Sequence, residues 1–339
     1  MKVIIPVAGA GTMLRPHTYT QPKALIPVAG KPILGFIIDR LQEQGLNDFI
    51  FVVGYLGDKI KSYINDAYPE IKAEFPLQSK RDGLGHAIWT AKSFVGEDEE
   101  VLIYLGDTII EADLQEVVNS KFSTVGLKKV DNPTQFGVAA LGDDGFLTSA
   151  IEKPRFPKSN KALVGVYKIK ESKALFEFLE EQVKKEKRNS GEIQLTDAIM
   201  SLIKSGVKIK SFKVNNWYDC GKADVLLETN AILLKKWGGS KDINEHFSNT
   251  VIVEPVSIAN GVKISNCIIG PNVTIGENAD LENAILKNSI IGAFSRLRSI
   301  ALHDSIIGSD CILGGMSQSL NIGDDTEIDL SGRNKENGQ

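Results

Sequence analysis

From about residue 250 onward, the chain repeats an aliphatic residue at a short and regular interval. Most neighbouring members of the series lie six residues apart, and Ile-Gly pairs recur along the same stretch, for example at 269–270 and 322–323. This period indicates a parallel β-helix, in which each rung buries one aliphatic side chain per face. Ordinary strands with a chance repeat are the alternative. The series is Ile258, Ile264, Ile269, Ile275, Leu281, Ile291, Leu297, Ile307 and Leu313, and its slips after Leu281 and Leu297 predict irregular coils.

Residues 1–240 carry a different pattern, in which apolar runs alternate with amphipathic stretches. The expected buried strands are 3–7, 49–53, 101–105 and 162–169, and the expected helices are 34–41, 58–68, 84–94, 172–188 and 222–237. Such alternation predicts a mostly parallel sheet covered by helices, with ligands bound beyond the carboxyl ends of its strands. Gly9–Met13 and Gly106-Asp107 each follow a strand, so we expect both on one edge of the sheet.

The change of pattern divides the chain into a first domain over 1–240, a β-helix over 250–328 and a polar tail over 329–339. We expect the tail to be disordered. The 339 residues suffice for two domains, and the net charge of −4 provides no basic field for nucleic acid or an anionic membrane. Three scattered cysteines suit free thiols in a reducing compartment, and the N-terminal apolar run is too short for a signal peptide or a membrane span. These features favour a cytoplasmic protein.

The first strand leads into a glycine-rich loop that matches neither of two common phosphate-binding patterns. A dinucleotide fingerprint needs G-x-G-x-x-G opening a helix, but Leu14 stands at the third glycine position and Pro16 interrupts any helix. A P-loop needs Gly-Lys followed by Ser or Thr, but Pro32 follows Lys31. The glycines can bring backbone N–H groups close to a ligand, and a surface turn with incidental glycines remains the alternative.

A longer pattern separates these two possibilities. GAGTMLRP over 9–16, PKALIPV over 22–28 and then Lys31-Pro32 resemble the signature of the sugar-phosphate nucleotidylyltransferases, among them the glucose-1-phosphate thymidylyltransferases. The resemblance extends to about residue 240, and longer family members also carry a β-helix, which is left-handed. It implies an α/β fold with a Rossmann-like mixed sheet.

The resemblance also implies a reaction. The family transfers a nucleotidyl group from a nucleoside triphosphate to a hexose 1-phosphate with Mg²⁺, which yields a sugar nucleotide and pyrophosphate. For this chain it favours dTTP or UTP as the nucleotide and glucose 1-phosphate as the sugar. Both substrates are anions, so catalysis would consist mainly of positioning and charge neutralisation.

By the same resemblance, three residues are the expected catalytic groups: Lys23, Lys153 and Asp107. Asp107, in YLGDT, and Asp219, in WYDCG, would hold the metal, because Mg²⁺ prefers oxygen ligands. Lys23 would contact the transferring phosphates. Considered alone, each aspartate equally fits a turn or helix cap, and the lysine fits a solvated loop cation.

Binding residues follow from the resemblance in two groups. The expected nucleotide-binding residues are Ala8, Gly9, Gly11, Thr12, Met13, Gln78 and Gly83. A glutamine amide can donate to and accept from one base edge, which fits thymine or uracil without excluding other bases. The expected sugar-phosphate-binding residues are Gly137, Glu152, Lys153 and Gly165, with a surface ion pair as the alternative for Glu152 and Lys153.

Met13 departs from the family pattern, which has an arginine that grips the triphosphate. Methionine offers neither a charge nor a donor, and the loss of one preorganised donor typically costs about 10²–10³ in turnover. Three interpretations follow: an active enzyme that uses Arg15 or another cation, a weakly active regulatory homologue that binds sugar nucleotides, or an introduced substitution. Because both aspartates and both lysines are present, we favour an enzyme.

Two further expectations concern the β-helix. Acyl transfer by its coils would make the chain bifunctional, but only His303 is available there as a base, and we rank this function last. Rungs such as Ile290-Ile291 would leave an apolar patch unless covered, so we expect β-helix faces to pack on another subunit or on the first domain. We therefore expect a homo-oligomer.

Overall fold

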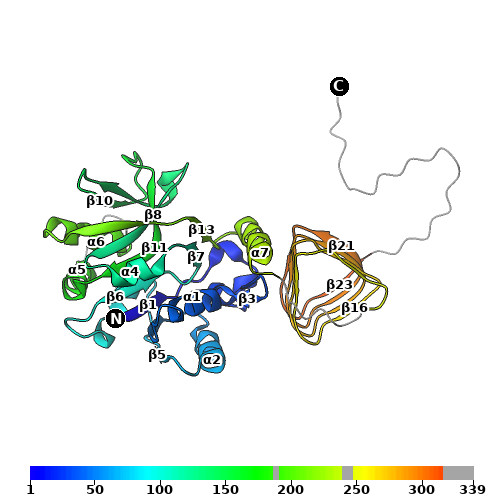
Figure 1. Cartoon of the computed structure of the whole chain (residues 1–339). Coiled ribbons are helices and arrows are strands. Elements are labelled where there is room, and N and C mark those ends of the chain that lie inside the picture. Colours follow the sequence, from blue (N-terminus) through cyan, green and yellow to red (C-terminus); the bar gives the residue numbers. More distant parts are fainter. Residues whose placement is uncertain (186–190, 239–246, 316–339) are drawn as a thin grey trace.

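The computed structural model of the chain describes residues 1–185, 191–238 and 247–315, which form an α/β domain with a β-helix beside it (Figure 1). The end of the helix expected over 172–188, the Ile-Gly pair at 322–323 and the polar tail at 329–339 lie outside the described residues.

A nine-stranded sheet runs through the first domain in the order β10-β9-β11-β6-β1-β4-β5, with β8 paired to β11 and β12 paired to β8. Strands β1, β4, β5 and β6 are mutually parallel. Strand β11 runs antiparallel to both β6 and β8, so the sheet is mixed, as the resemblance implies. The strands are β1 (Lys2–Pro6), β4 (Asp48–Val52), β5 (Lys72–Glu74), β6 (Val101–Tyr104), β8 (Ser123–Lys129), β9 (Gly137–Leu141), β10 (Leu147–Glu152), β11 (Lys161–Ile169) and β12 (Ile209–Lys213).

Helices cover both faces of this sheet. Alternate residues of β4 divide between them: Phe49 and Phe51 pack with α1 and α2, whereas Ile50 packs with α3, α5 and α6. The expected helix over 84–94 is shorter, because a 3-10 turn replaces its second half, and α4 and α6 were not expected. The helices are α1 (Ile33–Gln42), α2 (Gly57–Ala67), α3 (Leu84–Thr90), α4 (Leu114–Asn119), α5 (Ser172–Lys184), α6 (Leu195–Lys204) and α7 (Ala223–Trp237). In the described ranges, no helix has the length and apolar content needed to cross a bilayer.

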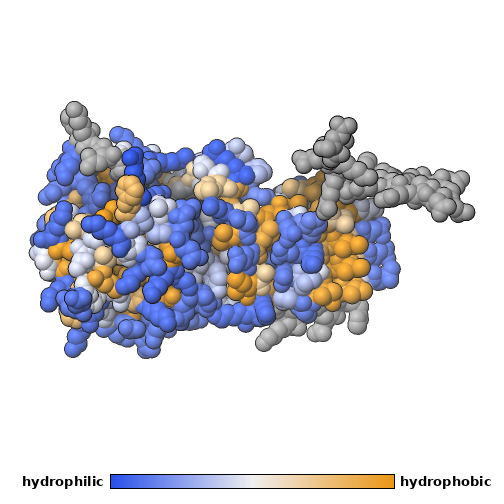
Figure 2. Space-filling model, turned by 90° about the horizontal axis from the view of Figure 1, so that it is seen from above, coloured by the Kyte–Doolittle hydropathy of each residue, from blue (hydrophilic) through white to orange (hydrophobic). Residues whose placement is uncertain are grey.

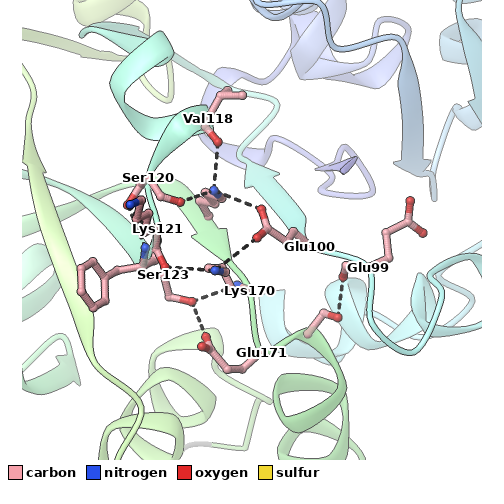
Figure 3. Close-up of polar contacts among 11 residues, drawn as sticks. Glu99, Glu100, Val118, Ser120, Lys121, Ser123, Lys170 and Glu171 are labelled. Atoms are coloured by element: carbon pink, nitrogen blue, oxygen red, sulfur yellow. Dashed lines mark hydrogen bonds and ion pairs between the residues drawn. The ribbon is translucent and has the colours of Figure 1, made fainter.

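A buried lysine fastens the end of α4 to the sheet. Lys168 on β11 is only 2% exposed, and its ammonium donates to the carbonyls of Val118 at 2.9 Å and Ser120 at 2.6 Å. Its third partner is the Glu100 carboxylate at 3.0 Å, which is also 3.7 Å from the Lys170 ammonium (Figure 3). The buried charge is therefore both paired and hydrogen-bonded, which burial of a lysine requires.

The β-helix consists of parallel strands that stack coil upon coil. Ile258 pairs with Ile275, and Ile291 pairs with Ile307, so one coil takes 17 or 16 residues. The strands are β14 (Val251–Ile252), β15 (Val256–Ile258), β16 (Lys263–Ser265), β17 (Ile268–Ile269), β18 (Val273–Ile275), β19 (Asp280–Lys287), β20 (Ser289–Ile291), β21 (Arg296–His303), β22 (Ile306–Ile307) and β23 (Ile312–Gly314). The handedness of this helix stays a prediction.

The structure corrects the expectation of irregular coils. Leu286 is fully buried beneath Leu302, which pairs with it in the next coil, and these two leucines fill the positions that the aliphatic series skipped. From 281 onward the inward positions are 281, 286, 291, 297, 302, 307 and 313, so the steps are five, five and six residues. A strict six-residue count missed them because, in the coils after Leu281, two of the three sides are one residue shorter.

The β-helix packs on the first domain along β18, β20 and the α7 helix. Ile290 is 1% exposed and belongs to the same apolar cluster as α1 and α7. The fully buried Asn230 on α7 accepts from the Ala29 amide at 2.8 Å and the Thr274 hydroxyl at 2.7 Å, and donates to the Asn272 carbonyl at 3.3 Å. We expected this face to pack either on another subunit or on the first domain, and the structure shows packing on the first domain.

Another face of the β-helix remains exposed. Val251, Ile268 and Ile285 lie side by side on β14, β17 and β19, and they are 57%, 43% and 51% exposed. Figure 2 shows hydrophobic surface gathered over the β-helix. Association of copies through it stays a prediction.

Candidate active site

A cavity of about 310 Å³ opens at the edge of the sheet where β1 and β6 end. Six of the expected site residues line it, and they come from three loops that are far apart in the sequence. These residues are Ala8, Gly9, Lys23, Gln78, Gly83 and Asp107. The expected position of the site beyond the carboxyl ends of parallel strands agrees with this cavity.

The glycine-rich loop turns sharply before it reaches Lys23. Gly11 has a φ of +59°, and a Cβ built on it would lie 2.9 Å from Cγ2 of Thr18 and 3.1 Å from Cβ of Lys23. The Thr18 hydroxyl donates to the Gly11 carbonyl at 2.8 Å and closes the turn. Thr12 and Met13 begin a short 3-10 turn, where Met13 is 67% exposed and does not line the cavity.

Lys23 and Asp107 meet across the cavity from opposite loops. The Lys23 ammonium donates to Oδ2 of Asp107, which follows β6. Asp219 lies beside this pair because β13 (Asn216–Asp219) runs antiparallel to β7 (Thr108–Glu111), with Asp219 opposite Thr108. The amide of Cys220 also donates to the Asp107 carbonyl at 3.2 Å. The ladder therefore fixes two carboxylates and one ammonium in one place.

The charges of this group are coupled. Burial, followed by the neighbouring Asp107 carboxylate, raises the pKa of Asp219, and Lys23 opposes the rise. Two carboxylates that repel one another gain from an added cation, and Mg²⁺ is commonly bound by one or two protein carboxylates plus substrate phosphates. Within the described residues, no cluster of three or more His, Cys, Asp or Glu side chains is arranged to hold a metal without such help.

Gln78 and Gly83 form a second wall of the cavity. Gln78 is 8% exposed, and its amide nitrogen lies 3.1 Å from the Gly83 carbonyl and 3.1 Å from Nδ1 of His86. Gly83 has a φ of +96°, and a Cβ there would lie 2.5 Å from the carbonyl oxygen of Ile193. The contacts of its amide nitrogen with Gly83 and His86 hold the Gln78 side chain in place at the cavity.

The expected sugar-phosphate residues lie on β9, β10 and β11, with Lys153 directly after β10, and none of them lines the cavity. Gly137 pairs with Glu152, whose Oε2 accepts from the Thr196 hydroxyl at 3.1 Å. Burial raises the pKa of the Glu152 carboxyl, and the Thr196 hydrogen bond and Lys153 oppose it. Lys153 has a φ of +40°, a strained conformation that is common at functional sites. Gly165 has a φ of +86°, and its carbonyl accepts from the Leu105 amide at 2.9 Å, which joins this group to the strand before Asp107.

The sequence analysis missed Arg81, which also lines the cavity. Its guanidinium lies 5.7 Å from the ring centre of Tyr55, and the Tyr55 hydroxyl donates to the Tyr19 carbonyl at 2.8 Å. The Arg15 guanidinium lies 4.9 Å from the ring centre of Tyr19. The sequence feature that could have indicated Arg81 is its position two residues before Gly83, inside a segment already expected to bind nucleotide. Thr196 was missed because α6 was not expected.

This fold and this arrangement of a glycine turn, a lysine and two aspartates are those of a nucleotidyltransferase domain. The family model described as nucleotidyl transferase matches residues 2–236, and the chain belongs to this family.

Relatives of known name match most of the chain. A low-salt glycan biosynthesis nucleotidyltransferase of Haloferax volcanii is 34% identical over 94% of this chain and 96% of its own length. The bifunctional protein GlmU of Methanocaldococcus jannaschii is 36% identical over 95% of this chain and 81% of its own. A glucose-1-phosphate thymidylyltransferase of Streptomyces griseus is 31% identical over 86% of this chain and 87% of its own.

Two solved structures match more than two thirds of the chain. A UDP-glucose pyrophosphorylase complexed with UDP-glucose superposes with a TM-score of 0.61 at 25% identity, covering 69% of this chain and 98% of its own. A putative glucose-1-phosphate thymidylyltransferase from Bacillus anthracis superposes with a TM-score of 0.59 at 28% identity, covering 73% of this chain and 97% of its own.

Proposed function

We propose that the protein transfers a nucleotidyl group from dTTP or UTP to glucose 1-phosphate and releases pyrophosphate. The observation that carries this proposal is the meeting of Lys23 and Asp107 at a cavity of about 310 Å³, with Asp219 held beside them by the β7–β13 ladder. The names of two relatives, a thymidylyltransferase and a UDP-glucose pyrophosphorylase, support a pyrimidine nucleotide and a glucose 1-phosphate.

In this proposal each group has a defined task. Asp107 and Asp219 would hold Mg²⁺, which neutralises phosphate charge when bound. Lys23 exchanges its partner Asp107 for the phosphates of the bound nucleotide, so its charge becomes available as the substrates arrive. Gln78 reads the base edge. Glu152 accepts from the sugar hydroxyls and Lys153 binds the sugar phosphate, which holds the attacking oxygen close to the α-phosphorus.

Arg81 supplies the guanidinium that is missing at position 13, where this chain has a methionine instead of the family's arginine. It reaches the cavity from the loop before Gly83, whereas the family's arginine belongs to the glycine-rich loop. The Arg81 guanidinium lies 5.7 Å from the centre of the Tyr55 ring, and the Tyr55 hydroxyl donates to the Tyr19 carbonyl, so Tyr55 links Arg81 to the glycine-rich loop. Arg15, the other cation considered, stacks on Tyr19 and does not line the cavity.

The test is pyrophosphate release with Mg²⁺, a panel of nucleoside triphosphates and several hexose 1-phosphates. We expect turnover by the native chain with a preference for dTTP or UTP, and a fall of about 10²–10³ in kcat/KM for Arg81→Leu. Adding Met13→Arg to Arg81→Leu restores most of that loss. Lys80→Gln is the matched control, because Lys80 is adjacent and exposed but does not line the cavity.

The competing hypothesis is a regulatory homologue that binds sugar nucleotides without turnover. Its motivation is Met13, and it predicts that the chain binds nucleotide without releasing pyrophosphate. If neither the native chain nor the Met13→Arg variant releases pyrophosphate with any substrate pair, the transferase proposal is wrong and the regulatory hypothesis takes its place.

Acyl transfer by the β-helix receives no support from the arrangement of His303. Its side chain is 81% exposed and its Nδ1 lies 3.1 Å from Oδ2 of Asp304, on the outer surface of β21. For the expected homo-oligomer, sedimentation velocity of the full chain is the direct test.

A further inference from the structure

The side-chain amide of Gln78 is oriented by two contacts at the wall of the cavity. Its nitrogen lies 3.1 Å from the Gly83 carbonyl oxygen and 3.1 Å from Nδ1 of His86. A carbonyl oxygen only accepts hydrogen bonds, so the amide nitrogen of Gln78, and not its oxygen, must face Gly83. The same nitrogen faces His86, and because an amide nitrogen only donates, Nδ1 must be the acceptor. His86 is therefore the neutral tautomer that carries its proton on Nε2.

The two contacts use both hydrogens of the Gln78 amide, so Oε1 is the polar atom that remains. Within the described residues, no group donates to Oε1. The side-chain atoms that the described ranges enclose without a partner are Nε1 of Trp89, Oγ1 of Thr124 and Nε1 of Trp217, so Oε1 of Gln78 is not sealed inside the protein. Because Gln78 lines the cavity, its side chain offers a ligand there an acceptor and no donor.

His86 and Gln78 are anchored on different elements. The His86 ring on α3 lies 5.6 Å from the Trp89 ring, with the two planes inclined by 40°. The backbone amide of Gln78 donates to the Val53 carbonyl at 2.8 Å, directly beyond the end of β4. His86 does not line the cavity, so its effect on a ligand there passes through Gln78.

An acceptor of fixed orientation distinguishes between pyrimidine bases. At N3, thymine and uracil carry an N–H donor, whereas cytosine carries a nitrogen lone pair. Opposite Oε1 of Gln78, the N–H forms a hydrogen bond and the lone pair is repelled. A glutamine amide that is free to turn over would instead offer its NH2 group to the cytosine lone pair. The restraint on the amide therefore decides which of these bases is favoured.

We propose that His86 is a positioning residue that makes the cavity selective for thymine or uracil over cytosine, because it holds the Gln78 amide with its oxygen toward the base. The proposal rests on the nucleotide binding that the proposed function assigns to this cavity. It adds the direction of the hydrogen bond to the base and the residue that sets this direction.

The test is calorimetric titration of the full chain with dTTP and with dCTP, in Mg²⁺ and without a sugar phosphate. We expect the native chain to bind dTTP at least about tenfold more tightly than dCTP. His86→Leu removes one of the two restraints on the amide and should reduce this preference roughly two- to twelvefold. His86→Asn is the matched variant, because asparagine has nearly the shape of leucine and its Oδ1 can accept in place of Nδ1. It should keep the preference.

Two results with these variants would overturn the proposal. One is an unchanged preference for dTTP in His86→Leu. The other is an equal loss of preference in His86→Leu and His86→Asn, since the packing of the ring and not its acceptor would then be responsible. A further titration needs no variant: dTTP methylated at N3 lacks the donor, and we expect the native chain to bind it at least about tenfold more weakly than dTTP. Equal affinity for these two nucleotides would also overturn the proposal.

These titrations do not require turnover, so the two proposals fail separately. A chain that binds dTTP selectively but releases no pyrophosphate would contradict the proposed function and support the role of His86. A chain that releases pyrophosphate but binds dTTP and dCTP equally would overturn the role of His86 alone.

Discussion

The hydroxyl of Tyr55 donates a hydrogen bond of 2.8 Å to the carbonyl of Tyr19, and each of these two rings also carries a guanidinium on its face. Tyr19 belongs to the glycine-rich loop, whereas Tyr55 follows β4. The contact therefore joins the loop that lacks the family's arginine to the side chain that holds Arg81.

Tyr55→Phe should weaken nucleotide binding slightly, because it removes the hydrogen bond but keeps the ring beneath Arg81. One such bond contributes about 0.5–1.5 kcal/mol, so we expect KM for the nucleoside triphosphate to rise roughly two- to twelvefold. Tyr55→Leu also removes the stacking surface and should have a larger effect. Steady-state kinetics with the nucleotide varied measure both, and wild-type values for Tyr55→Leu would contradict the role given to this tyrosine.

Gly9→Ala should separate ligand contact from folding. A Cβ built on Gly9 meets no atom within 4 Å, so the unfolding midpoint should stay within experimental error. If a nucleotide phosphate lies against this backbone, the added methyl should raise KM for the nucleotide at least tenfold. In the matched Gly11→Ala variant, the positive φ and the Thr18 contact predict a loss of stability of about 1–2 kcal/mol. Equal KM values for Gly9→Ala and wild type would remove Gly9 from the site.

His17 predicts a pH dependence of stability. Burial lowers the pKa of His17 below 6.5, because the imidazole lies against the β-helix, where a Cβ built on Gly308 would be 3.7 Å from Nδ1. The unfolded chain then binds more protons than the folded chain below about pH 6.5, and acidification through this range costs folding free energy. The wild-type unfolding midpoint should therefore fall more between pH 7.5 and 5.5 than that of His17→Gln. Parallel pH profiles would show that the folded imidazole titrates normally.

Lys168→Met should destabilise the first domain strongly. The substitution leaves the carbonyls of Val118 and Ser120 without their donor and removes the nearer of the two ammonium partners of Glu100, so we expect a loss of about 2–4 kcal/mol in urea unfolding. Lys173→Met is the matched control, since its ion pair with Glu97 is exposed at both ends and should change stability by less than about 0.5 kcal/mol. A loss no larger than the control's would mean that the buried network is energetically neutral.

The sequence was most informative where periodicity determines structure. The apolar runs that became β1, β4, β6 and β11 were located correctly, because a buried strand needs continuous apolar residues whichever strands it pairs with. The antiparallel direction of β11 was not visible in its residues, since pairing direction depends on how the chain returns to the sheet. The six-residue count missed Leu286 and Leu302 for a related reason. The number of residues in each side of a coil depends on the turns between its strands, which the spacing of aliphatic residues does not show.

The candidate site shows the same limit. Lys23 and Asp107 are 84 residues apart, and their contact depends on the register of strands that no local pattern reveals. The family resemblance identified both residues because each stands in a sequence motif of the family, although their contact exists only in the folded chain. It could not name Arg81, which lies outside the motif and acquires its position from Tyr55.

The seam between the two domains limits how the chain can be shortened. The side-chain amide of Asn230 forms hydrogen bonds with Ala29 in the first domain and with Asn272 and Thr274 in the β-helix. A chain cut after α7 would expose the apolar surface that Ile290 covers and would leave Asn230 to be solvated by water. The β-helix therefore covers an apolar surface of the first domain. A chain shortened by its removal would need polar residues in place of the apolar ones on that surface.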